Sequence, residues 1–214
     1  MSDSRPREPL PGPRLSELSL SFTRPIPRAV RDYGRAVDPK ILEPGDLLLF
    51  SHKSGCWTSR RIVKQQSHLF PPEHACWYHA AVSGGGYEIC EATFSGVKAY
   101  EYWDYMTGTY DIKVRRLIGA DEKTRSLIAY YAATGVNTQY GFFNLPDLKK
   151  SLAGQNPWSR RFRFSSGVVC SQLYFEACMR VGFLLVNIPP ERVCPAHLSQ
   201  SNLMTDVELA WVSV

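Results

Sequence analysis

The stretch "CWYHAAVSGGGYEICEA", residues 76–92, predicts two short strands joined by a glycine-rich loop. If Gly84–Gly86 form that loop, His79 on the first strand lies directly opposite Glu91 on the second. Directly opposed side chains share one face of a sheet, with Cβ atoms about 4.5–5.5 Å apart. The hairpin therefore predicts a carboxylate within hydrogen-bonding reach of an imidazole.

A cysteine far along the chain lies where a helix is expected to begin. In "SSGVVCSQLYFEACMRVGF", residues 165–183, Gly167 and two valines precede Cys170, and apolar residues at near-helical spacing follow it as far as Gly182. The first turn of a helix has free backbone N–H groups and the positive end of the dipole, which favour a thiolate. Cys170 is therefore a candidate nucleophile.

The hairpin and the cysteine together have the residue types of a hydrolytic triad. A thiol that cleaves an acyl bond needs a base and a third group that orients the base. His79 and Glu91 supply these roles, so Cys170, His79 and Glu91 are the candidate catalytic residues. Taken singly, each also has an ordinary interpretation, as a core thiol, a strand histidine and a surface carboxylate.

The remaining segments predict further strands and helices around the hairpin. We expect a buried strand after Asp46, a helix over 55–66, strands over 96–102, 109–117 and 207–214, and a helix over 121–134 capped by Asp121. Sequential strands flanked by helices, without βαβ alternation, are typical of an α+β domain with a mainly antiparallel sheet.

The chain divides into an N-terminal arm and one folded domain. Seven of the fifteen prolines lie before position 40, in a segment with few consecutive apolar residues. We expect residues 1–35 to form a flexible arm and residues 36–214 to form the domain. The arm is either a plain disordered tail or a docking segment that a partner recognises.

Composition and charge exclude several functional classes. The chain is 44% hydrophobic, which is typical of a globular protein, and its apolar runs are too short to span a bilayer. The net charge is +5, of which residues 1–40 supply +3 through eight basic and five acidic residues. Only "SRRFRF", residues 159–164, resembles a basic nucleic-acid contact, so we expect no nucleic-acid partner and no membrane span.

The N-terminus and the cysteines indicate a cytoplasmic site of synthesis. "MSDSRPREPLPGPR" has no apolar stretch followed by a small-residue cleavage site, so we expect no secretory signal peptide. The six cysteines are then better interpreted as thiols than as a disulfide framework.

The sequence around the hairpin argues against a metal site and against a phosphate-binding loop. Cys76 and His79 differ in strand parity and point to opposite faces, which argues against a zinc site, and we expect no metal or other cofactor. The glycine triplet lacks the Lys-Ser/Thr that follows a phosphate loop. The aromatic run "YEYWDYMTGTY", residues 100–110, is either core packing or the wall of a cleft.

Several motifs resemble one enzyme superfamily when taken in order. These are "PGDLLLF", "YHAAV", "ICEA" with a following "GV", "QYGF", "VVCSQLYFEA" and "PAHLSQS", which together cover about residues 42–205. They resemble the circularly permuted branch of the NlpC-type, papain-like cysteine hydrolases, whose relatives include bacterial peptidases and amidases and the lecithin–retinol acyltransferase group. The resemblance implies a papain-like fold.

The resemblance also implies roles for individual residues. The strand histidine of the family is the base, the polar residue on the next strand orients it, and the cysteine at the helix start attacks. These roles fall on His79, Glu91 and Cys170. The motif positions Tyr140 and Gln172 are expected to bind substrate, although Gly141 and Gln172 replace acidic residues common in the family and leave substrate choice open.

The reaction that the resemblance implies is amide cleavage through a Cys170 thioester. Peptidoglycan stem peptides are the leading substrate, and a small basic protein would approach that polyanionic wall favourably. Export without a signal peptide, as for antibacterial effectors injected into rival cells, would deliver the protein there and implies export machinery and an immunity protein as partners.

Two alternatives remain open from the sequence. One is transfer or hydrolysis of a lipid acyl group, with an apolar groove built from Phe142, Phe143 and Trp158. The other is a binding module whose catalytic site is disused.

Overall fold

The computed structural model describes residues 25–55, 57–93, 96–134 and 170–214. Tyr140, the proposed groove residues and residues 159–164 therefore lie outside the described residues. The helices are α1 (Arg28–Tyr33), α2 (Trp57–Gln66), α3 (Pro72–Ala75), α4 (Glu122–Ala133), α6 (Cys170–Arg180) and α7 (Pro195–Gln200), with 3-10 turns η2 (Pro39–Ile41), η3 (Tyr102–Tyr105) and η4 (Pro190–Arg192). The strands are β1 (Arg35–Val37), β2 (Leu47–His52), β3 (His79–Gly85), β4 (Glu88–Thr93), β5 (Gly96–Glu101), β6 (Tyr110–Leu117), β7 (Met204–Val207) and β8 (Trp211–Ser213).

Six of the strands form one central sheet in the order β5-β4-β3-β2-β6-β7. Every neighbouring pair in it is antiparallel. A separate two-stranded sheet joins β1 to β8. The prediction of an α+β domain with an antiparallel sheet packed against helices is confirmed.

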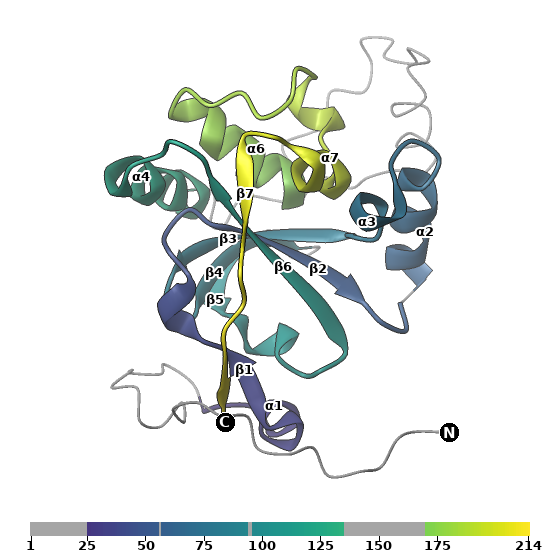
Figure 1. The fold of residues 1–214 in the computed structure, drawn as a ribbon, viewed down its shortest axis with the longest axis vertical. Coiled ribbons are helices and arrows are strands. Elements are labelled where there is room, and N and C mark those ends of the chain that lie inside the picture. Colours follow the sequence, from purple (N-terminus) through teal and green to yellow (C-terminus); the bar gives the residue numbers. More distant parts are fainter. Residues whose placement is uncertain (1–24, 56, 94–95, 135–169) are drawn as a thin grey trace.

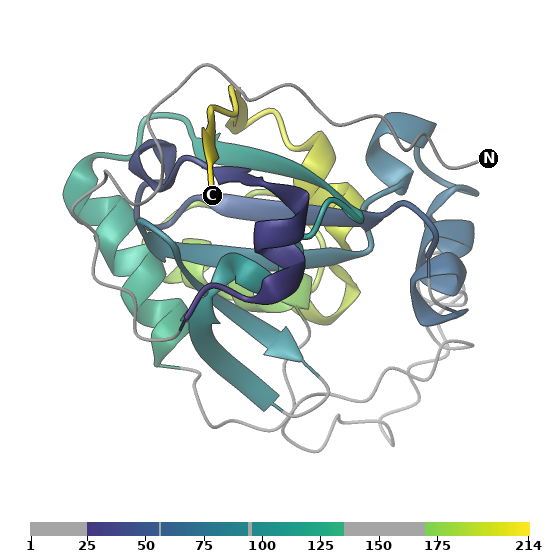
Figure 2. The same cartoon turned by 90° about the horizontal axis from the view of Figure 1, so that it is seen from below.

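The central sheet separates two hydrophobic cores because its strands alternate. On β2, Leu47 and Leu49 pack into the core formed with α4 and α6, whereas Leu48 and Phe50 pack into the core that contains Val30 of α1. Figure 1 shows α4, α6 and α7 on one side of the sheet and α1 with β1 on the other. Figure 2 shows the same sheet from the α1 side.

The two long helices on the α6 side begin where the sequence predicts. The Asp121 side chain accepts a 2.8 Å hydrogen bond from the Thr124 backbone N–H, which caps α4. Helix α6 begins at Cys170 and is largely buried between the sheet and the C-terminal segments. Its start places the candidate nucleophile in the first turn, as expected.

The folded part of the chain begins before residue 36. Residues of the predicted arm form α1 and the start of β1, and Val30 of α1 is fully buried in the core below the sheet. Pro27 precedes α1, and Gly34 ends it with a φ of 78°. We expected the domain to begin at residue 36, so this segment was not predicted. Val30 is the one buried residue of α1, and a single valine among prolines and charged residues does not produce a recognisable hydrophobic pattern.

The single final strand predicted over 207–214 is wrong. The chain instead makes two short strands, β7 next to β6 and β8 next to β1, and changes sheet between them. At the crossover, the Ala210 carbonyl accepts a 2.8 Å hydrogen bond from the Asp38 backbone N–H. The alternation of apolar and polar residues over 207–214 predicts a strand, but it does not reveal that the chain pairs with two different strands here.

Candidate active site

The loop of the β3–β4 hairpin begins two residues later than the glycine triplet predicts, at Gly86 instead of Gly84. Ser83 pairs with Ile89, and an irregularity follows between Ser83 and Gly85, so the loop lies at Gly86 and Tyr87. Gly85 and Gly86 have φ values of 98° and 62°, which favour glycine. The expected loop of three glycines is therefore wrong, because the first two continue the strand.

The predicted direct pairing of His79 with Glu91 is consequently also wrong. Val82 pairs with Cys90, so the next pair along the two strands is Ala81 with Glu91. His79 is two residues before Ala81 and therefore lies on the same face of β3. A shift of two residues preserves the face, whereas a shift of one would have reversed it. Glu91 reaches across this diagonal, and its Oε2 accepts a hydrogen bond from His79 Nε2.

The Glu91 carboxylate is buried and has two further hydrogen-bond donors. Its side chain is 1% exposed. The hydroxyl of Tyr105 in η3 donates a 2.6 Å hydrogen bond to Oε2, and the hydroxyl of Tyr100 on β5 donates to Oε1. A buried carboxylate is tolerated only when such donors replace water. The two phenols therefore hold Glu91 in place for His79.

Aromatic stacking fixes the same groups from the side. The Tyr105 ring stacks on Phe50 with a centroid distance of 3.7 Å and lies nearly parallel to the His79 ring at 6.0 Å. Phe50 is the residue paired with His79 across β2 and β3. The imidazole thus lies between rings of the sheet and of η3, with the Tyr78 ring as a third neighbour at 6.2 Å.

Cys170 lies at the start of α6, is 8% exposed, and interacts with the His79 side chain closely enough to raise the pKa of that ring. Because Nε2 of His79 is occupied by Glu91, Nδ1 is the ring nitrogen left for the thiol. The next residue, Ser171, donates a 2.7 Å hydrogen bond to the Val193 carbonyl and so ties the first turn of the helix to the segment before α7.

The imidazole joins two sides of the sheet. Cys170 belongs to the core on the α6 side, whereas Glu91 points to the opposite face with Tyr100 and Tyr105. His79 is the first residue of β3, at the end of the sheet, where one ring can contact both sides. The geometry therefore brings together all three predicted catalytic residues from α6, β3 and β4.

Electrostatics at the site favour a protonated imidazole. Burial acts to lower the pKa of His79, but the negative charges of Glu91 and an ionised Cys170, with hydrogen bonds to both, outweigh it and raise this pKa to about 10. The arrangement can thus hold an imidazolium between the Glu91 carboxylate and the Cys170 sulfur.

The other described cysteines are in environments that disfavour a thiolate. Burial raises the pKa of Cys90, Cys178 and Cys194 to about 12 in each case, and burial also raises the pKa of Cys76. Cys194 also lies 3.0 Å from Nδ1 of His197, but burial lowers the pKa of that histidine to about 4. This second pair caps α7 and has no positive charge near neutral pH.

The predicted substrate-binding residues are only partly placed. Gln172 lies on α6 two residues after Cys170, and its amide donates a 2.7 Å hydrogen bond to Glu176. Tyr140 lies outside the described residues. Within the ranges that the structure describes, no group of three or more His, Cys, Asp or Glu side chains could hold a metal ion.

Tyr100 and Tyr105 are the site residues that the sequence did not identify. Their run is aromatic-rich, and the structure divides it, since Tyr102, Trp103 and Met106 pack in the core while the two site tyrosines contact Glu91. Only the register of β4 with β5 and the turn η3 distinguish these tyrosines from their buried neighbours.

No protein-family model matches the chain, and no curated protein matches it. None of the helices described is long and apolar enough to cross a membrane.

Proposed function

We propose that the protein is a cysteine hydrolase that cleaves an amide bond through a thioester on Cys170. The observation that carries this proposal is the alignment of Cys170, His79 and the buried Glu91, in which Cys170 interacts with the His79 ring and the ring is hydrogen-bonded to Glu91. The order His, acid, Cys along the chain and the helix-start cysteine agree with a permuted papain-like architecture, which we include in the proposal.

Acylation would use Cys170 as the nucleophile and the protonated His79 ring as the acid. The Cys170 thiolate attacks the acyl carbon, and the carbonyl π electrons move onto the oxygen. The His79 imidazolium then donates its proton to the leaving amine as the C–N bond breaks and the thioester forms. Glu91 keeps the ring oriented through Nε2 and stabilises its positive charge.

Deacylation would use the same ring in the opposite direction. Neutral His79 takes a proton from a water molecule that attacks the thioester, the C–S bond breaks, and the acid product leaves. The Cys170 thiolate and the His79 imidazolium are restored. The Cys170 backbone N–H, at the start of α6 where helical N–H groups lack intrahelical carbonyl partners, is the candidate donor to the oxyanion.

Peptidoglycan stem peptides are the substrate class that we propose first. The resemblance to bacterial permuted amidases and peptidases and the net charge of +5 support this choice. Delivery to the cell wall, with an immunity protein to protect the producer, is part of the same proposal.

Incubation of the full chain with purified muropeptides, followed by mass spectrometry, tests the reaction. We expect new cleaved products with the wild type and none with Cys170→Ala or His79→Ala, with all three proteins giving the same circular dichroism spectrum. Cleavage that persists in Cys170→Ala would contradict the proposed nucleophile.

Lipid acyl groups are a second substrate class, favoured by the exposed side of α2. Trp57 is 66% exposed there, and α2 follows β2 at the end of the sheet where β3 begins with His79. The same mass spectrometric assay on phospholipids distinguishes this class, because a released fatty acid or a lysolipid replaces the cleaved muropeptide.

A further inference from the structure

Helix α2 presents one face of aromatic and basic side chains to the outside. Trp57, Arg60, Arg61 and Lys64 follow the i, i+3, i+4, i+7 spacing of a single helical face, and all four are exposed. The Arg61 guanidinium lies over the Trp57 ring, 4.1 Å from its centroid. We name these four residues the α2 face.

The charges of the α2 face have no acidic counterpart nearby in the sequence. No Asp or Glu occurs between Asp46 and Glu73. Among the described residues, no salt bridge joins an acid to any of the three cations, and Arg60 donates only to the Ser54 carbonyl. Arg60 and Lys64 are like charges at i, i+4, which mildly destabilises a helix. A face with three cations and no acid creates a positive potential that attracts an anionic partner.

The other face of α2 is anchored to the active-site end of the domain. Gln66 is fully buried, and its amide donates hydrogen bonds to the Ala75 and Trp77 carbonyls, just before His79. Its carbonyl oxygen accepts a 3.0 Å hydrogen bond from the Ala196 backbone N–H of α7. The α2 face is therefore held rigidly beside the start of β3.

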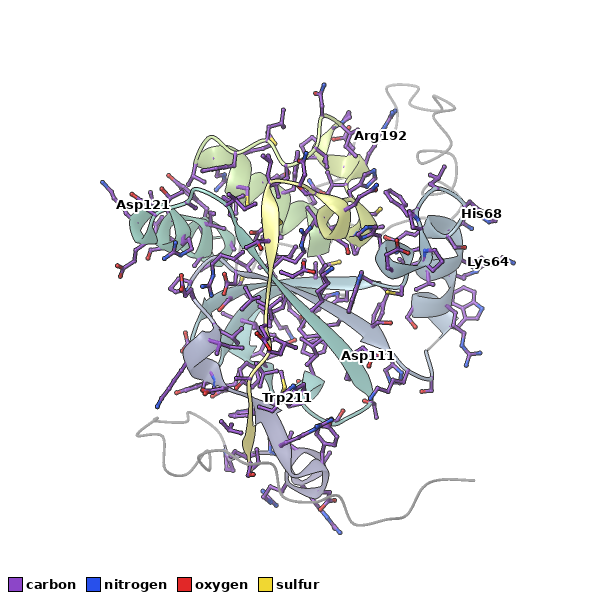
Figure 3. The ribbon with its side chains drawn as sticks, in the orientation of Figure 1. Lys64, His68, Asp111, Asp121, Arg192 and Trp211 are labelled. Carbon is purple, nitrogen blue, oxygen red and sulfur yellow. The ribbon has the colours of Figure 1, made fainter. Side chains whose placement is uncertain are left out.

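The apolar residues next to the basic face favour a bilayer over a soluble polyanion. Leu69, just after the helix, is 51% exposed, and Trp57 exposes most of its ring. Figure 3 shows Lys64 and His68 pointing outward at the edge of the molecule, and both cartoon views place α2 at that edge. Exposed cations beside an exposed tryptophan suit the headgroup region of a bilayer, where cations meet lipid phosphates and tryptophan rings lie at the interface.

We propose that the α2 face docks onto an anionic phospholipid surface. The cations contact lipid phosphates and carboxylates, while Trp57 and Leu69 enter the headgroup region. Three cations near such a surface correspond to an affinity gain on the order of a hundredfold. This inference does not depend on the thiol chemistry, and it places the end of β3 that carries His79 toward the membrane.

Co-sedimentation of the full chain with vesicles tests the proposal. We expect binding to phosphatidylcholine vesicles containing roughly one-third phosphatidylserine, weaker binding at high salt, and little binding to phosphatidylcholine alone. The double variant Arg61→Glu, Lys64→Glu should lower partitioning at least about tenfold. Trp57→Phe should remove a blue shift of tryptophan emission that accompanies binding.

A matched control changes the same charge elsewhere. Lys123→Glu with Arg180→Glu alters exposed residues of α4 and α6, and Arg180 also lies over an aromatic ring, that of Tyr131. Equal loss in both double variants, or no preference for anionic vesicles, would overturn the proposal. The proposal would also be overturned if soluble polyglutamate released the protein from the vesicles and vesicle binding gave no tryptophan blue shift. That result would assign the face to soluble polyanions.

Discussion

The Tyr105 hydroxyl donates a 2.6 Å hydrogen bond to Oε2 of Glu91. This is the same oxygen that accepts from His79 Nε2, so one atom receives a phenol and an imidazole. A carboxylate that accepts charge-assisted bonds from several donors is fixed in position. The relationship makes Tyr105 a positioning residue, which acts on the cysteine through Glu91 and His79.

Replacement of Tyr105 by phenylalanine should lower kcat on whichever substrate is cleaved, with KM little changed. Loss of one hydrogen bond to a charged group corresponds to roughly tenfold or more in rate, while the ring keeps its stack on Phe50. Tyr102→Phe is the matched control, since its hydroxyl donates to the Val37 carbonyl away from the site. That control should lose stability of about 1 kcal/mol and retain kcat. Equal kcat losses in both variants would indicate a general packing effect.

The ring of His79 should titrate far above its usual range. Because its pKa is raised from 6.5 to about 10, His79 stabilises the fold fully below about pH 6.5, and this contribution is lost as pH rises through about 10. Nuclear magnetic resonance of the labelled imidazole measures the midpoint. In Glu91→Gln the midpoint should fall, since the Glu91 charge is the largest cause that raises it. A wild-type midpoint near 6.5 would argue against the charged pair.

Turnover should tolerate Glu91→Gln better than loss of the nucleophile. The amide oxygen can still orient His79, but it stabilises the imidazolium less, so we expect kcat to fall by roughly a hundredfold. Cys170→Ala should abolish turnover. The measurement is kcat for both variants on one substrate, and full activity in Glu91→Gln would remove Glu91 from the mechanism.

Iodoacetamide at low excess should modify Cys170 before the other described cysteines. Cys170 lies beside the His79 ring, which can take up its proton, whereas burial raises the pKa of Cys76, Cys90, Cys178 and Cys194. Peptide mass mapping after short labelling identifies the site. His79→Ala should slow the labelling of Cys170 selectively, while unchanged labelling would show that the imidazole does not activate the thiol.

Truncation of Val30 should destabilise the domain although it lies in the predicted arm. The side chain is fully buried below the sheet, so Val30→Ala should cost about 2 kcal/mol, or roughly 4–8 °C in Tm. Arg28→Ala, on the exposed side of the same helix, should leave Tm nearly unchanged. For the same reason we expect deletion of residues 1–35 to lower Tm. Calorimetry that finds equal Tm values for all four proteins would show that α1 does not contribute to stability.

Strand parity explains why the site could be predicted from a register that proved wrong. His79 and Glu91 share a face in any register shifted by an even number of residues, and the observed register differs from the predicted one by two. The start of α6 could be predicted from the sequence because Gly167 and two valines precede an amphipathic run. Tyr100 and Tyr105, which hold Glu91, could not be predicted as site residues. Their positions depend on η3 and on the pairing of β4 with β5, and neither produces a local pattern in the sequence.

The small β1–β8 sheet also determines how the domain would respond to mechanical load. Arg35 pairs with Ser213 and Val37 with Trp211, so the two chain ends enter this ribbon at the same end. A pull applied between Arg35 and Ser213 would therefore peel the pairs apart one at a time, which needs less force than shearing them together. The ribbon would open first, and the central sheet with its catalytic hairpin would stay closed until the tension reached β2 and β7.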